Sequence, residues 1–195
     1  MADAAVYAPG WDAITAAVEA VVPSRDPLHW RINPQSEDDT FIGLSAYRGD
    51  GCWLLVTYGL TELYEKLSDD PGTSGWGYEL TMRVPAGDPQ PPRWALRLVE
   101  KLGRVVDSGE VSLGPGHRLQ SGGPITGAQD TALTALAFSA DPQLPEFDSA
   151  NGHAAFLTMV GITADELARM KATSTAQVLA EIAVSSPLLI TDVTR

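Results

Sequence analysis

The sequence is poor in cysteine, in basic residues and in long apolar runs, and each shortage excludes a class of protein. Its single cysteine, Cys52, permits no intrachain disulfide, which favours a protein of the reducing cytosol. Lysine and arginine number 13 against 25 aspartates and glutamates, so the net charge is −12 at pH 7. Phosphate backbones and anionic membrane surfaces repel such a chain, and no apolar run approaches the roughly 20 residues that span a bilayer. We therefore predict a cytoplasmic protein that binds neither nucleic acid nor membranes.

The sequence also lacks the clustered ligands and glycine-rich loops that mark common metal and cofactor sites. Zinc sites normally contain a closely spaced pair of ligands. Here the candidate ligands are far apart in the chain; they are His29, His117, His153 and Cys52. No P-loop signature occurs, and residues 75–77 lack the third glycine of a dinucleotide site. We predict no metal and no cofactor.

What the sequence does contain is the patterning of one mixed α/β domain. Its 195 residues, 44% of them hydrophobic, suffice for a single core. Apolar spacing and a capping box at Thr163 predict helices over about 11–22, 94–106, from 163, and 176–183. Strands are predicted over 41–47, 52–58, 76–84, 133–138, 155–160 and 188–191. We predict an α/β (α+β) fold in which a mixed, largely antiparallel sheet is flanked by helices.

Three patterns predict where side chains are buried. Residues 52–58 are apolar on both faces, which is typical of a central strand covered on both sides and predicts a buried Cys52. Residues 76–84 alternate between apolar and polar, so Glu79 and Arg83 are predicted to form an exposed charge pair on a solvated face. Trp11 lies on the apolar side of the first helix and is predicted to pack in the core.

The loop between the strands predicted over 52–58 and 76–84 is the candidate binding surface. Glu62, Glu65, Asp69 and Asp70 concentrate negative charge around Tyr64. The plainer interpretation is a solvated face. The functional interpretation is a docking patch for a basic protein segment, because aromatic residues supply much of the binding energy at protein interfaces. The predicted binding residues are Tyr64, Asp69, Asp70, Tyr58 and Trp76.

A second hypothesis is an enzyme whose site is assembled from scattered residues. Its candidate catalytic residues are Glu79, Arg83, His29 and His153. A structure distinguishes the two hypotheses, because catalytic groups must converge in a cleft within hydrogen-bond reach of one another.

Several strings, taken together in order, resemble the suppressor of fused (SUFU)-like family. They are PGWDAI (9–14), DPLH (26–29), VTYGLTELY (56–64), SGWGYELTMR (74–83), PRW (92–94), NGH (151–153) with FLTMVGIT (156–163), and LITD (189–192). The resemblance extends over residues 9–192, nearly the whole chain. We therefore expect a single SUFU-like domain over residues 1–195 that corresponds to the amino-terminal lobe of the family, with no second lobe.

The resemblance implies a non-enzymatic protein-binding module. Animal members are regulators that hold a short peptide as an added strand between two lobes. On the family pattern, Tyr64 matches a peptide-contacting tyrosine, and Asp70, or alternatively Asp69, matches an acidic residue of the same loop. Single-lobe forms are similar to bacterial SUFU-like proteins, some of which serve as immunity proteins in toxin systems. The prediction that follows is an antitoxin-type module that binds a basic protein partner.

Overall fold

The computed structural model describes residues 7–22, 26–37 and 39–195, and these ranges contain four helices and eight strands. The helices are α1 (Pro9–Glu19), α2 (Arg93–Asp107), α3 (Ala164–Ala172) and α4 (Thr175–Ser185). The strands are β1 (Leu28–Arg31), β2 (Gly43–Arg48), β3 (Cys52–Tyr58), β4 (Thr73–Pro85), β5 (Arg118–Gln120), β6 (Leu133–Ala140), β7 (Phe147–Ser149) and β8 (Gly152–Thr163).

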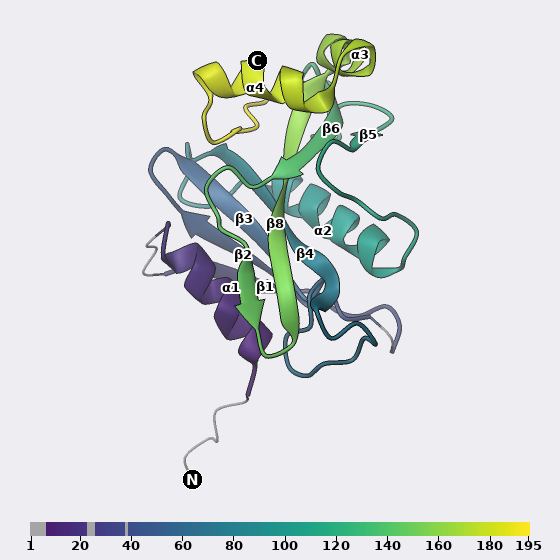
Figure 1. The fold of residues 1–195 in the computed structure, drawn as a ribbon. Coiled ribbons are helices and arrows are strands. Elements are labelled where there is room, and N and C mark those ends of the chain that lie inside the picture. Colours follow the sequence, from purple (N-terminus) through teal and green to yellow (C-terminus); the bar gives the residue numbers. More distant parts are fainter. Residues whose placement is uncertain (1–6, 23–25, 38) are drawn as a thin grey trace.

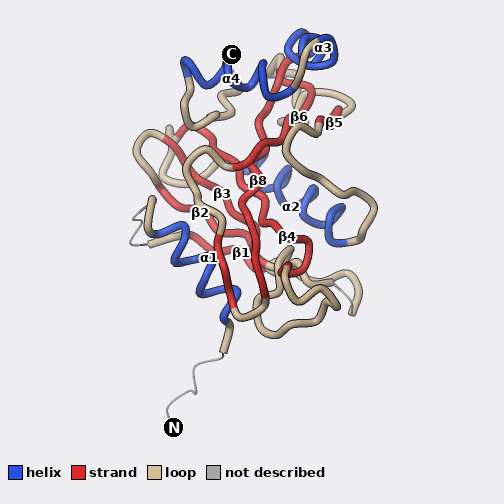
Figure 2. The backbone as a smooth tube through the Cα atoms, in the orientation of Figure 1, coloured by secondary structure: helices blue, strands red, loops and turns tan. Residues whose placement is uncertain are grey.

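The described strands form one sheet with helices on both faces (Figures 1 and 2). The strand order is β1-β2-β3-β4-β8-β6-β5, and β7 pairs with β8 outside this path. The β4–β8 pair is parallel, whereas the other described pairs are antiparallel. The predicted mixed, largely antiparallel sheet is therefore confirmed.

Alternation along β3 assigns each helix to a face of the sheet. Leu55 packs in the same cluster as the buried side of α2, whereas Leu54 and Val56 pack with α1 on the opposite face. Helices α3 and α4 lie over the β6 end of the sheet and pack on Ala135 and Ala137, while Leu136 between them faces the α2 cluster. No helix of the described ranges is both long and apolar enough to cross a membrane.

Local signals explain where several elements begin and end. Helix α2 begins directly after two prolines, one residue before the predicted start at about 94. The predicted capping box of α3 is also confirmed, since Thr163 Oγ1 accepts from Glu166 N at 3.2 Å and Glu166 Oε2 accepts from Thr163 N at 2.8 Å. Helix α1 ends at Glu19, three residues earlier than predicted. The predicted strand over 188–191 is wrong, because Leu189 has a φ of 52°, in the left-handed region that breaks an extended run.

The burial predictions have mixed outcomes. All seven residues of β3 are buried, so the prediction of a central strand with a buried Cys52 is confirmed. Trp11 is only half-buried and packs at the edge of the core against the Tyr58 ring, with 4.4 Å between centroids. Its predicted place inside the core is therefore wrong.

The polar face of β4 is buried. Glu79, Thr81 and Arg83 are each 0% exposed, because β4 lies inside the sheet and other segments bond to each of the three. Arg83 donates to both carboxylate oxygens of Asp141 at 2.7 and 2.9 Å, and Thr81 Oγ1 donates to one of them at 2.6 Å. The predicted exposed charge pair is wrong, since a polar period of two also fits a strand face whose polar groups bond to one another.

Candidate functional site

The chain leaves β3 in a turn that a buried carboxylate organises. Glu79 Oε1 accepts hydrogen bonds from Gly59 N at 3.0 Å, Thr61 N at 2.9 Å and Thr61 Oγ1 at 2.7 Å. Its Oε2 accepts from Thr57 Oγ1 at 2.6 Å. Burial raises the pKa of Glu79 to about 7, because desolvation outweighs the bonds that favour the ionised form. Gly59 is required here, since its φ is 112° and a Cβ would lie 2.1 Å from the Thr40 carbonyl oxygen.

A second carboxylate, that of Glu62, shapes the loop that follows. Its oxygens accept from Leu67 N at 2.7 Å, Ser68 N at 2.5 Å, Gly75 N at 3.1 Å and Lys66 Nζ at 2.9 Å. Desolvation would raise the pKa of Glu62, but these four bonds together lower it to about 2. Glu62 is therefore ionised under all physiological conditions, and it closes residues 62–75 into a compact loop.

Three distant elements hold the base of this loop in place. From α1, Gly10 N donates to Leu63 O at 3.0 Å, and a Cβ on Gly10 would lie only 2.2 Å from Glu62 O. From the turn between β7 and β8, Asn151 Nδ2 donates to Glu62 O at 2.7 Å. From β4, Ser74 Oγ accepts from Glu62 N at 2.9 Å. The loop is consequently rigid at its base, while its tip extends into solvent.

The tip of the loop and the adjoining first part of β4 carry apolar side chains that the fold leaves exposed. Tyr64 is 45% exposed, Leu67 67% and Trp76 37%, and these are three of the five large hydrophobic residues found exposed in the described ranges. Leu67 separates two hollows, one of about 230 Å³ shared with Tyr64 and one of about 390 Å³ shared with Trp76. We call residues 64–70 together with Trp76 the docking loop.

The charge of the docking loop is negative. Its one cation is used inside the loop, because Lys66 Nζ donates to Ser68 Oγ at 2.7 Å and to Thr73 O at 2.5 Å in addition to Glu62. Glu65, Asp69 and Asp70 are exposed and form no ion pair with any residue that the structure describes. The exposed surface thus combines aromatic and aliphatic area with unpaired carboxylates, which suits contact with a cationic, partly apolar segment.

Two residues of the surface predicted from the sequence, Tyr58 and Glu62, are buried in the structure. Tyr58 is fully buried, and its hydroxyl lies 2.6 Å from that of Tyr47 and 3.2 Å from Thr15 Oγ1. It cannot contribute contact area, because α1 covers β3 at this point. Glu62 is likewise buried and acts as an internal anchor. Sequence reasoning missed Leu67, whose exposure no local pattern signals.

The four candidate catalytic residues do not converge. Glu79 and Arg83 are four positions apart on β4, or about 13 Å, and bind different partners. His29 lies on β1, which β2 and β3 separate from β4, and bonds to Ser45. His153 is exposed and bonds to Asp148 and Glu146. No hydrogen bond joins any two of the four in the part of the chain that the structure describes. Those same ranges contain no group of three or more His, Cys, Asp or Glu side chains placed to hold a metal ion.

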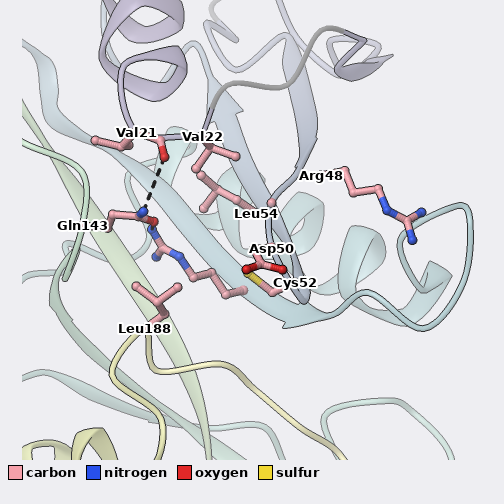
Figure 3. Close-up of a pocket in the computed structure, with 10 residues that line it drawn as sticks. Val21, Val22, Arg48, Asp50, Cys52, Leu54, Gln143 and Leu188 are labelled. Carbon is pink, nitrogen blue, oxygen red and sulfur yellow. Dashed lines mark hydrogen bonds between the residues drawn. The ribbon is translucent and has the colours of Figure 1, made fainter.

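A separate cavity of about 310 Å³ lies between the end of α1 and the middle of the sheet (Figure 3). Val21, Val22, Leu54 and Leu188 give it aliphatic walls, and Cys52 lies beside them. Burial raises the pKa of the Cys52 thiol, so the thiolate needed for nucleophilic attack is disfavoured. Cys52 is therefore not activated for nucleophilic attack.

Comparison with known proteins identifies relatives over most of the chain. The family described as Suppressor of fused protein (SUFU) matches residues 38–195. The human Suppressor of fused homolog is 26% identical over 169 residues, which cover 79% of this chain and 32% of that protein, and the mouse homolog gives the same values. The chain thus spans about a third of the length of these curated relatives.

Solved structures share the fold. The crystal structure of Drosophila Suppressor of Fused superposes with a TM-score of 0.85 at 24% identity, over 97% of this chain and 51% of that one. A chain of the Sufu-Fu complex gives 0.84 at 24% identity, covering 96% and 91%. A putative SUFU homolog from Neisseria gonorrhoeae gives 0.65 at 13% identity, covering 93% and 92%.

Proposed function

The chain belongs to the suppressor of fused family, and we propose that it is a protein-binding module whose partner contacts the docking loop. The observation that carries this proposal is the exposure of Tyr64, Leu67 and Trp76 on a loop whose base is fixed from three sides. Exposed apolar side chains on a rigid base lose little conformational entropy on binding, so more of their contact energy appears as affinity. A relative solved as a Sufu-Fu complex supports protein binding as the activity.

We propose further that the partner is basic. Glu65, Asp69 and Asp70 have no cationic partner in the described ranges, and the net charge of the chain is −12. Opposite fields accelerate encounter and orient the two surfaces. The single cysteine supports a cytoplasmic location.

An immunity role, in which the module neutralises a toxin by covering its surface, is the specific form of this proposal. The fold shared with the Neisseria gonorrhoeae homolog over 92% of that chain supports a family form of this size in bacteria. Many toxins that act on nucleic acids are basic, which agrees with an acidic docking loop. The protein encoded by the neighbouring gene is the first partner to test.

The test compares the docking loop with a matched surface elsewhere. Binding of the neighbouring gene product is measured by surface plasmon resonance for the wild type, Tyr64→Ala and Val184→Ala, where Val184 is 86% exposed on α4. We expect Tyr64→Ala to weaken binding by about 2 kcal/mol, or about 30-fold, because central aromatic residues act at this scale. Val184→Ala should leave the affinity unchanged. Equal affinities for all three proteins would show that the partner binds elsewhere.

Charge is tested separately through association kinetics. Asp69→Asn with Asp70→Asn removes two charges, and the asparagine oxygen can still accept the 2.9 Å bond from Gly72 N. Asp50→Asn with Asp88→Asn removes two exposed charges elsewhere and serves as the control. We expect the first pair to slow association and to flatten its salt dependence, because exposed charges act through a field that salt screens. Association that is equally fast at low and high salt for the wild type would contradict a basic partner.

A further inference from the structure

Four of the 13 basic residues of the chain lie on α2, on one side of that helix. At 3.6 residues per turn, the four fall within an arc of about 80°. The opposite side is the one that packs on the sheet. One of the four, Arg104, is half-buried, and the other three are exposed. We call these three the basic row: Arg93, Arg97 and Lys101.

The basic row differs from Arg104 in having no partner among the residues that the structure describes. Arg104 Nη2 lies 3.1 Å from Glu100 Oε1 and 3.1 Å from Asn33 O, so its charge is used within the fold. No hydrogen bond or ion pair within the described ranges involves the basic row. Its successive members lie about 6 Å apart along the helix axis, because they are four residues apart. A net charge of −12 thus coexists with a regular row of three unpaired cations.

Apolar surface and a hollow border the basic row. Trp94, Leu98 and Val105 are half-buried and follow one side of the row along the helix. A hollow of about 400 Å³ lies against Arg97 and Lys101 and continues to the end of α2, and its lining also includes Arg104 with its partner Glu100, and Glu110. Cations beside partly exposed apolar side chains can pair with the charges of a partner while the apolar side chains are buried against it. Isolated surface cations cannot combine the two effects.

We propose that the basic row is a second docking surface, which binds a short acidic segment of a protein. Carboxylates at positions i and i+4 of a helix repeat at about 6 Å, which matches the spacing of the row. A long polyanion such as nucleic acid is repelled by the rest of the protein, whereas a short segment lies within a Debye length, about 8 Å, of the row. The surface is distinct from the docking loop, which is acidic and for which we propose a basic partner.

The test uses a blocked alanine-based peptide of 16 residues with glutamate at every fourth position, titrated into ¹⁵N-labelled protein by NMR at low salt. The variant Arg97→Gln with Lys101→Gln removes two charges of the row. The matched control, Arg31→Gln with Lys171→Gln, removes two exposed charges from other elements. Two further probes are the same peptide with glutamine in place of glutamate, and an oligothymidylate of 15 nucleotides.

We expect chemical-shift changes confined to α2 and residues next to it, and a loss of affinity of about fivefold in the row variant, the scale of two exposed ion pairs. The control variant should bind like the wild type, and the glutamine peptide should not bind. Equal weakening by both variants would show that only net charge matters and would overturn the proposal. Tighter binding of the oligothymidylate than of the glutamate peptide would show that the row binds nucleic acid and would overturn the proposal. Binding of the glutamine peptide would show that charge does not drive the contact and would overturn it as well.

Discussion

Replacing the buried carboxylate of Glu79 with an amide tests how the base of the docking loop is built. Glu79→Gln keeps the size of the side chain. The amide oxygen can accept from Gly59 N, Thr61 N and Thr61 Oγ1, as Oε1 does now. The amide nitrogen can donate to Thr57 Oγ1, whose own hydrogen then points to Leu80 O at 3.4 Å. The variant should therefore fold with the same turn.

The expected effect is a change in how stability depends on pH. Glu79 has a pKa of about 7 in the folded protein, against 4.5 for a glutamate of the unfolded chain. Because the folded state holds this proton more tightly, stability falls as pH rises from 4.5 to about 7. At about 1.4 kcal/mol per unit, the ionised form costs about 3 kcal/mol at pH 8. Glutamine cannot ionise, so the variant should gain about 2.5 kcal/mol relative to wild type between pH 5 and pH 8, because part of the loss has already occurred at pH 5.

Urea unfolding of both proteins at pH 5, 6, 7 and 8 measures this difference, and the other titrating groups cancel because both proteins share them. The nearest titratable groups, Tyr58 and Tyr78, have raised pKa values through burial and stay neutral in this range. Parallel curves for the two proteins would refute the reasoning, since they would mean that the four hydrogen bonds fully offset desolvation. Glu79→Ala is the control, which should lose stability at every pH because it leaves buried donors without partners.

Three further predictions concern residues around the loop and the core. Asn151→Asp should cost about 2 kcal/mol and increase hydrogen exchange at residues 62–63, because the donor to Glu62 O is replaced by a carboxylate; unchanged exchange would contradict this. Cys52 should react with a thiol reagent only in denaturant, and fast labelling of the native protein would disagree with its burial. Trp11→Ala should cost less than the roughly 3 to 5 kcal/mol of a fully buried tryptophan, because the ring is half-buried, and thermal unfolding measures the loss.

How far the sequence predicts the fold depends on whether a pattern has one structural meaning. An apolar run such as β3 has one, since only a strand covered on both sides places every side chain out of water. The alternation in β4 has two structural meanings, because Glu79 and Arg83 are as compatible with solvent as with buried partners. The partner of Arg83, Asp141, lies 58 residues away and gives no local signal. The sequence therefore predicts the strand correctly but assigns its polar face to the wrong environment.

The candidate site is less predictable for the same reason. Glu62 and Glu65 are three residues apart in one acidic stretch, yet one is an internal anchor and the other faces solvent. What separates them is a set of backbone donors from Leu67, Ser68 and Gly75, which exists only once the loop has closed. The resemblance to a family pattern identifies Tyr64 as a candidate binding residue. The pattern does not show which tyrosines are exposed and which, like Tyr58, are buried.

Glu62 and Glu79, the two carboxylates that anchor the docking loop, accept the same number of hydrogen bonds and have opposite pKa shifts. Each accepts four, but Glu62 has the Lys66 ammonium among its donors, whereas Glu79 is fully buried and has no cationic donor among the described residues. The bonds that shape the tip of the docking loop therefore persist at any physiological pH, since the pKa of Glu62 is about 2. Those at its base depend on a group that titrates near pH 7. Any pH dependence of partner binding near neutrality that comes from the loop's own anchors must consequently enter through Glu79, and it should disappear in Glu79→Gln while the contribution of Tyr64 remains.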